Sequence, residues 1–212
     1  MSISVCMVDD HELVRSGISL ILNQTDDISL TNQYSCLDDC LPVLKLAKWD
    51  VLLLDISLSD MNGLDGIRLV KETSPDLPIL ILTMHAESQF GIRAMQLGAN
   101  GYLTKDKAST DLLTAIRTVV SGKKYIGKEF SEMIAMNMFG DNNIVPHERL
   151  SNREFDVMLL LAKGESPTNI AQSLDLSIKT VSTYRARILD KLQLNNNAEL
   201  IRYCLNHELV FF

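Results

Sequence analysis

Short apolar runs alternate with amphipathic stretches throughout residues 1–122, and this alternation sets the class of fold. Five segments are predicted to be strands, at residues 3–8, 28–34, 51–55, 79–83 and 101–103. Each is followed by a stretch with the apolar spacing of a helix, at 12–22, 37–47, 64–72, 88–97 and 110–120. Unbroken apolar runs are typical of strands covered by helices on both faces. The sequence therefore predicts an α/β domain built on a doubly wound, five-stranded parallel sheet.

The remaining residues divide into a linker and a second domain. Residues 123–146 contain spaced methionines and a Gly-Asp-Asn-Asn cluster, which predicts a partly helical linker ending in a loop. Residues 147–212 have helical periodicity throughout. Their helix signals are a capping box, a serine N-cap followed by proline, and two amphipathic stretches, at 151–154, 166–167, 178–192 and 198–207. We expect a small all-α domain of four helices.

Composition excludes several classes of protein. With 46% apolar and 22% charged residues, the chain has the balance of a globular protein and not of a disordered one. No apolar run approaches the roughly 20 residues that span a bilayer, and the first residues lack the basic start of a signal peptide. The four cysteines lack metal-ligand spacing and are too few for a disulfide framework. We therefore expect a cytoplasmic protein without a membrane partner.

The net charge of −7 is unevenly distributed along the chain. Residues 1–122 hold 9 basic and 16 acidic residues, whereas residues 147–212 hold 8 of each. Within the second domain, the segment 177–192 carries four basic residues and one acid, a local charge of +3. Such a segment suggests a polyanionic partner, although a solvated helix face would have the same composition.

Charged and polar side chains follow four strands of the predicted sheet. The carboxyl ends of parallel strands meet at one edge, where such sheets place their sites. These residues are Asp9, Asp10, Asp55, Thr83 and Lys105. Three converging carboxylates repel one another unless a cation lies between them, and carboxylate and water ligands suit Mg²⁺. Each residue alone has an ordinary explanation as a turn, cap, strand or surface residue; together they predict a pocket for a phosphoryl group held on a carboxylate.

Four segments resemble the receiver domain of two-component response regulators, over about residues 1–122. They read M-V-D-D-H-E, L-L-D-I-S-L, I-L-T-M-H and G-A-N-G-Y-L-T-K, at 7–12, 53–58, 81–85 and 98–105. The resemblance implies a flavodoxin-like fold in which Asp55 accepts a phosphoryl group from a sensor histidine kinase. It further implies that Asp10, Asp55 and the backbone carbonyl of Ser57 bind Mg²⁺ directly, and that Asp9 binds it through water.

The same resemblance implies a switch. Thr83 would donate to one phosphoryl oxygen, Lys105 would pair with another, and Tyr102 would be the aromatic residue whose rotamer follows the switch. Two residues depart from the family pattern, since Asp106 stands where many receivers have proline and Met84 is larger than the residue often found there. These departures leave open the geometry of the loop after Lys105 and the lifetime of the phosphoryl group.

Two helices joined by a short break, the second of them basic, are typical of a helix-turn-helix. In the helix predicted at 178–192, apolar residues share one face and small or polar residues the other. We expect the side chains that meet base edges to be Ser182, Thr183 and Ala186. We expect the side chains that bind phosphates to be Lys179, Arg187, Lys191 and Arg185. The alternative, an amphipathic helix without a nucleic-acid role, has the same periodicity.

Three further segments resemble the LuxR-type DNA-binding domain, and with the receiver they resemble the NarL/FixJ class of transcriptional regulators. They read L-S-N-R-E-F-D-V, G-E-S-P-T-N-I-A and L-S-I-K-T-V-S-T-Y-R-A-R-I-L-D-K-L, at 150–157, 164–171 and 176–192. The stretches at 121–126 and 179–185 are similar to the GacA/UvrY-type members. The resemblance implies that the last helix mediates dimerisation. Its apolar stripe, a dimer seam or plain core, comprises Ile201, Cys204 and Leu205.

The sequence thus predicts a transcription factor whose phosphorylation on Asp55 controls homodimerisation and binding to double-stranded promoter DNA. We expect no enzymatic activity beyond its own phosphorylation and dephosphorylation. Two alternatives use the same sheet. A metal-dependent phosphatase would need a general acid two residues after Asp55, where Ser57 stands. A flavodoxin-like nucleotide binder would need a glycine-rich phosphate loop after the first strand, where Asp9 and Asp10 stand.

Overall fold

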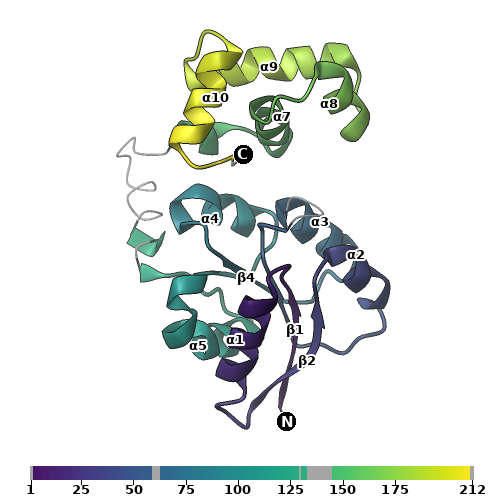
Figure 1. Ribbon diagram of the computed structural model, residues 1–212, viewed down its shortest axis with the longest axis vertical. Coiled ribbons are helices and arrows are strands. Elements are labelled where there is room, and N and C mark those ends of the chain that lie inside the picture. Colours follow the sequence, from purple (N-terminus) through teal and green to yellow (C-terminus); the bar gives the residue numbers. More distant parts are fainter. Residues whose placement is uncertain (1, 59–62, 129, 133–144, 211–212) are drawn as a thin grey trace. The chain divides into compact units, whose positions relative to one another are not determined.

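The computed structural model describes every residue except 1, 59–62, 129, 133–144 and 211–212. It divides into two compact units, residues 1–135 and 136–212 (Figure 1). The first unit holds one five-stranded sheet with the order β2-β1-β3-β4-β5, in which all neighbours are parallel. The strands are β1 (Ile3–Val8), β2 (Ile28–Tyr34), β3 (Val51–Leu54), β4 (Ile79–Thr83) and β5 (Gly101–Thr104). The predicted α/β class is confirmed.

Helices follow the strands in the order that the sequence predicts. The α-helices of this unit are α1 (Glu12–Leu22), α2 (Leu37–Cys40), α3 (Gly63–Thr73), α4 (Glu87–Gln96) and α5 (Ala108–Val120). Helices α1 and α5 pack together on one face of the sheet, where Leu22 and Leu112 share a buried cluster with Met7, Leu53 and Leu82. In β3, β4, β5 and the second half of β1, alternate residues face the opposite way and are also buried, whereas β2 at the side of the sheet is largely exposed. A sheet buried on both faces explains the unbroken apolar runs.

The prediction of a single helix over residues 37–47 is wrong in the length of that helix. The α-helix ends at Cys40, and the chain continues as a 3-10 turn, η1 (Leu41–Val43). The proline within this turn, Pro42, has no amide hydrogen, and its ring disfavours a continuous α-helix around it. The apolar residues beyond the turn have helical spacing without forming a helix.

The first unit extends beyond residue 122, where the sequence predicts a linker. The backbone of Tyr125 pairs with the edge of β5, because its amide donates to Asn100 O at 2.9 Å and its carbonyl accepts from Tyr102 N at 3.3 Å. Further along, Phe130 is fully buried, and its ring lies against Gly91 of α4. Tyr125 is thus attached to the sheet and Phe130 packs on α4, so the first unit includes residues that the sequence analysis assigned to the linker. The three methionines of the expected linker lie outside the described residues.

The second unit contains a 3-10 turn and helices around a small core. Its elements are η3 (Pro146–Arg149), α7 (Asn152–Ala162), α8 (Pro167–Ser173), α9 (Ile178–Leu192) and α10 (Asn197–Asn206). The predicted capping box is present, since Ser151 Oγ accepts from Glu154 N and Glu154 Oε2 accepts from Ser151 N at 2.7 Å. The predicted N-cap Ser166 also accepts from Asn169 N at 3.1 Å. Across the described residues, every helix is too short or too polar to span a membrane.

The contact between Phe130 and α4 gives a testable prediction. A methyl group added at Gly91 would lie 2.7 Å from the Phe130 ring, whereas one added at Gly17 of α1 meets open space. We expect Gly91→Ala to lower the free energy of unfolding of the first unit by about 1–3 kcal/mol through overpacking. Gly17→Ala should leave it unchanged or raise it by up to about 1 kcal/mol. Urea unfolding followed by the fluorescence of the single tryptophan, Trp49, measures this unit. Equal stability of the two variants would contradict the packing of Phe130.

Candidate functional site

Four parallel strands bring their carboxyl ends to one edge of the sheet. Asp9 follows β1 and Asp55 follows β3, and these strands are in register because Val8 pairs with Leu54. Thr83 is the last residue of β4. Asp9, Asp55 and Thr83 are all buried, so the polar pocket lies within the edge of the sheet and not on its surface. The geometry therefore brings together the residues that the sequence places at the strand ends.

The ammonium group of Lys105 lies between two carboxylates. Its Nζ is 2.6 Å from Asp55 Oδ2 and 2.7 Å from Asp9 Oδ2, and its side chain is only 7% exposed. Burial alone would lower the pKa of Lys105, but its hydrogen bonds to Asp55 and Asp9 outweigh burial and raise it. Lys105 is therefore a permanent positive charge directly beside Asp55.

The second oxygen of Asp55 and the hydroxyl of Thr83 face the loops that follow their strands. Asp55 Oδ1 accepts from the amide of Ser57 at 3.0 Å. Thr83 Oγ1 lies 3.4 Å from Ser57 Oγ and accepts from the amide of His85 at the same distance. A carboxylate beside a fixed cation, with a hydroxyl nearby, can act as a nucleophile toward phosphorus and stabilise the charge on the transferred group.

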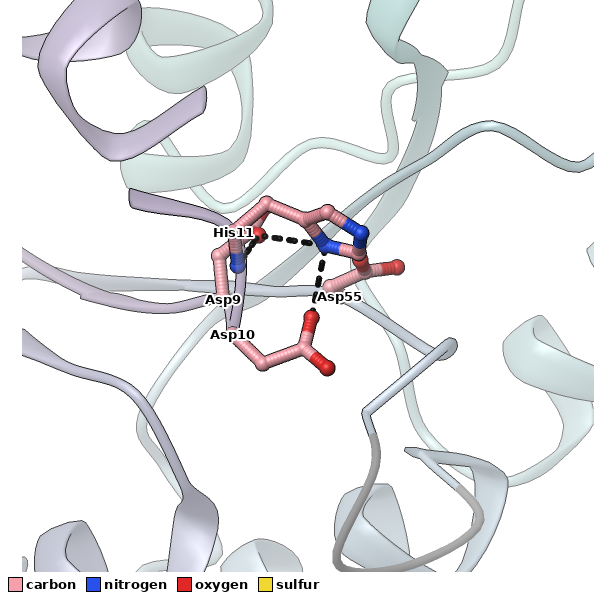
Figure 2. A group of neighbouring side chains, drawn as sticks. All are labelled: Asp9, Asp10, His11 and Asp55. Atoms are coloured by element: carbon pink, nitrogen blue, oxygen red, sulfur yellow. Dashed lines mark hydrogen bonds and ion pairs between the residues drawn. The ribbon is translucent and has the colours of Figure 1, made fainter. Parts of the chain in front are cut away.

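A group of possible metal donors lies on the β1 side of this pocket (Figure 2). Donor atoms of Asp9, Asp10, His11 and Asp55 all lie within 4.8 Å of one another. Three carboxylates against one lysine leave negative charge that a divalent cation would neutralise, so the donor set fits a metal ion. Of these four residues, His11 is the one that the sequence analysis did not assign. Its place directly after the Asp-Asp pair was the available signal.

Tyr102 links the pocket to the segment after β4. Its side chain is fully buried, and its hydroxyl donates to the carbonyl of His85 at 3.1 Å. Burial, with smaller contributions from the charges of Glu87 and Asp55, raises the pKa of Tyr102 well above its usual range, so the hydroxyl stays protonated.

The two residues that depart from the family pattern, Met84 and Asp106, are both exposed, and Met84 is 73% exposed. The side chain of Met84 therefore points away from the core.

In the second unit, α8 and α9 are joined by the short turn that the sequence predicts. The apolar face of α9 is buried through Val181, Ile188 and Leu192. The opposite face is exposed, and it carries Lys179, Ser182, Thr183, Ala186 and Arg187. An open hollow of about 330 Å³ lies on the first half of this helix, lined by Ser177, Lys179, Thr180, Thr183, Tyr184 and Arg187. Of these, Ser177, Thr180 and Tyr184 were not among the expected contacts.

Two basic residues of α9 are engaged within the unit. Lys191 Nζ lies 2.6 Å from Glu154 Oε2 of the capping box, and Arg185 Nε donates to Asn197 Oδ1 at 2.6 Å. Burial would raise the pKa of Glu154, but the contacts with Lys191 and Ser151 lower it overall. These two side chains therefore hold α9 against α7 and α10 in this structure. The remaining basic residues of the outer face, Lys179 and Arg187, are exposed.

The apolar stripe on α10 divides between core and surface. Cys204 is fully buried, and burial raises the pKa of its thiol to about 12. Ile201 is half-buried, and Leu205 is 43% exposed. Cys204 thus belongs to the core of the unit, and Leu205 is the member of the stripe that reaches the surface.

Comparison with known families now identifies both units. Residues 5–117 match the response regulator receiver domain family, and residues 148–204 match the luxR family of bacterial regulatory proteins. The chain belongs to the response regulators that carry a LuxR-type DNA-binding domain. This membership places it among transcription regulators, and not among the phosphatases or nucleotide binders considered as alternatives.

Full-length relatives support the assignment. The chain is 36% identical over 208 residues to the response regulator UvrY of Escherichia coli, covering 98% of this chain and 95% of UvrY. It is 35% identical over 209 residues to the response regulator GacA of Pseudomonas aeruginosa, covering 98% of each. These matches confirm the similarity to GacA/UvrY-type members that the sequence indicates.

Solved structures agree with the fold of this response regulator. RcsB from Salmonella enterica serovar Typhimurium, bound to promoter rprA in the presence of the phosphomimetic BeF₃⁻, is 27% identical, with a TM-score of 0.77. That match covers 96% of this chain and 98% of RcsB. A second RcsB–DNA complex is 26% identical, with a TM-score of 0.74 and coverage of 96% and 98%. Another RcsB structure contains two dimers bound to two parallel DNAs.

The contact between Lys191 and Glu154 gives a prediction about stability and pH. Because the pKa of Glu154 is lowered in the folded unit, its contribution is present above the unfolded value of 4.5 and is lost as the pH falls below it. We expect Lys191→Ala to lower the melting temperature of the second unit at neutral pH, and this difference to shrink in acid. Lys163→Ala, at the exposed end of α7, is the matched control. Thermal melting is followed by circular dichroism, and the transition that occurs without a change in Trp49 fluorescence belongs to the second unit. An unchanged melting temperature of that transition in Lys191→Ala would contradict the contact.

Proposed function

We propose that Asp55 accepts a phosphoryl group from the phosphohistidine of a sensor histidine kinase, and that this modification controls dimerisation and sequence-specific binding to promoter DNA. The observation that carries the proposal is the position of Lys105, whose ammonium lies 2.6 Å from Asp55 and 2.7 Å from Asp9. A buried carboxylate held by a cation at the edge of a receiver sheet is suited to gaining a charged group. A kinase and DNA as partners also favour a cytoplasmic location.

In the proposed reaction, a carboxylate oxygen of Asp55 forms a bond to phosphorus while the bond from phosphorus to the donor histidine breaks. The leaving imidazole takes up a proton. Asp10 and Asp55, with the carbonyl of Ser57, would hold Mg²⁺, and Asp9 would contact it through water. The metal would supply positive charge to the transferred phosphoryl oxygens. Lys105 supplies further positive charge and orients Asp55.

The phosphoryl group would add negative charge and new acceptor oxygens next to Thr83. The Thr83 hydroxyl now accepts from the amide of His85, and donating to the new oxygens instead would move the segment after β4. The carbonyl of His85 accepts from Tyr102, and the amide of Tyr102 donates to Tyr125 in the segment that leaves the receiver. This chain of contacts supports a route from Asp55 to the residues that lead toward the second unit.

The second unit would read DNA with the exposed face of α9. Ser182, Thr183 and Ala186 would meet base edges in the major groove, and Lys179 and Arg187 would bind phosphates. We propose a smaller role on DNA for Arg185 and Lys191, because both are held by partners within the unit. Dimerisation through α10 would use the exposed Leu205 and the half-buried Ile201, and not the buried Cys204. The structures of RcsB bound to promoter DNA and of RcsB dimers on DNA support this proposal.

Phosphorylation of Asp55 is tested by labelling. We expect the wild-type protein to incorporate phosphate from acetyl phosphate in the presence of Mg²⁺, and Asp55→Ala to lose this incorporation completely because the attacking oxygen is gone. Asp39→Ala, which removes an exposed carboxylate from α2, should be labelled like the wild type. Acid-stable or persistent labelling of Asp55→Ala would show that the phosphoacceptor lies elsewhere.

The role of Arg187 is tested on DNA. Because phosphate contacts position a protein without reading sequence, Arg187→Ala should weaken binding to every duplex and reduce the slope of log K against log salt by about one. Thr183→Ala, on the same exposed face, should instead change the preference among sequences and leave the slope unchanged. Fluorescence anisotropy of labelled duplexes at several salt concentrations measures both quantities. A loss of affinity confined to one sequence would contradict the assignment of Arg187 to phosphates.

A further inference from the structure

Asp9, the first residue of the acidic cluster, turns His11 toward that cluster. The amide of His11 donates to Asp9 Oδ1 at 2.9 Å, which bends the chain between the end of β1 and the start of α1. The bend directs the imidazole back over the pair of aspartates, with Nδ1 2.7 Å from Asp10 Oδ1 and 3.6 Å from Asp9 Oδ1 (Figure 2). The position of this ring is thus set by the same turn that positions the carboxylates.

The imidazole belongs to the set of possible metal donors. Its donor atom and one oxygen each of Asp9, Asp10 and Asp55 lie within 4.8 Å of one another. A cation held by Asp10 and Asp55 would therefore have a nitrogen atom among its near neighbours. The side chain of His11 is 63% exposed, so it can rotate without disturbing the core. Its backbone begins α1 without a hydrogen bond from its own side chain to that helix, so the ring is not needed as a cap.

We propose that His11 contributes a nitrogen ligand to the metal site, and that the site therefore favours Mn²⁺ or a similar first-row transition ion more strongly than an all-oxygen site would. This inference rests on the proposed metal site at Asp10 and Asp55. Mg²⁺ prefers oxygen ligands and retains its water, whereas an imidazole nitrogen suits the transition ions. A single nitrogen donor therefore changes which divalent ion the receiver selects.

A purely electrostatic role for His11 makes a different prediction. If the ring only pairs with Asp10, it competes with every divalent cation in the same way, and removing it would raise the affinity for Mg²⁺ and Mn²⁺ in parallel. If Nδ1 is a ligand, removing it lowers the affinity for Mn²⁺ while the affinity for Mg²⁺ stays constant or rises. The ratio of the two dissociation constants therefore separates a ligand from an ion-pair partner.

The experiment measures Mg²⁺ and Mn²⁺ binding to the full chain by calorimetry at about pH 8, where free imidazole is neutral, without a phosphodonor. We expect His11→Ala to reduce the preference for Mn²⁺ by about tenfold, the lower end of the effect of groups that support a metal site. His85→Ala, which removes the other imidazole of the first unit near the pocket, should leave the preference unchanged. Pulsed electron paramagnetic resonance of bound Mn²⁺ should detect coupling to a ligand nitrogen in the wild type and in His85→Ala, and not in His11→Ala.

Each outcome decides between the proposals. A parallel change in both affinities, or wild-type Mn²⁺ without nitrogen coupling, overturns the role of His11 and leaves the metal site of the proposed function intact. Saturable binding that is unaffected by Asp55→Ala would place the ion elsewhere. That result, or a wild-type protein that binds neither ion, would overturn the metal site itself.

Discussion

The buried contact of Lys105 with Asp9 and Asp55 is the interaction on which the receiver unit depends. Two carboxylates this close destabilise a buried edge of a sheet unless positive charge lies between them. Lys105 supplies that charge at 2.6 and 2.7 Å, and breaking such a pair typically costs about 3–5 kcal/mol. The same arrangement leaves a net negative charge that favours a cation and an oxygen atom suited to phosphoryl transfer. The side chains that keep this buried edge of the sheet stable are therefore the same ones that favour a bound cation and phosphoryl transfer.

The sheet that positions these residues could largely be predicted from the sequence. The bounds of β1, β2 and β4 agree with the predicted segments. For β4, whose residues are all buried, the apolar run itself marks both ends of the strand. The helix α9 also agrees, since Ser177 caps its first turn and Gln193 ends it in a left-handed conformation. The parallel pairing of the strands follows from the β/α repeats, and their order is the flavodoxin-like one that the resemblance to receivers implies.

Other features depend on contacts between residues distant in the sequence and could not be predicted in this way. The early end of α2 is different, because Pro42 is a signal within the sequence itself, although the spacing around it favours one longer helix. The burial of Phe130 depends on Gly91, which lies 39 residues earlier in the chain. Likewise, Lys191 has the spacing of a DNA contact, but Glu154 on another helix holds its ammonium. The periodicity of a sequence shows on which face of a helix a residue lies, but not which other residue it contacts.

Two units with different chemistry are joined by a segment that begins as part of the first. Tyr125 extends the edge of β5, and its partner there is Tyr102, the residue that contacts the segment after β4. A change at Thr83 can therefore reach the end of the receiver through backbone hydrogen bonds as well as through side chains.

The most direct test of this account begins by selecting a duplex that the protein binds from a random pool. The affinity of the protein for this duplex is then measured with and without Mg²⁺ and beryllofluoride. Beryllofluoride occupies the place of a phosphoryl group without a covalent transfer, so it isolates the effect of added negative charge at Asp55. The account predicts tighter binding and a greater fraction of dimer when both reagents are present. Unchanged affinity and an unchanged oligomeric state, with beryllofluoride bound at Asp55, would contradict it.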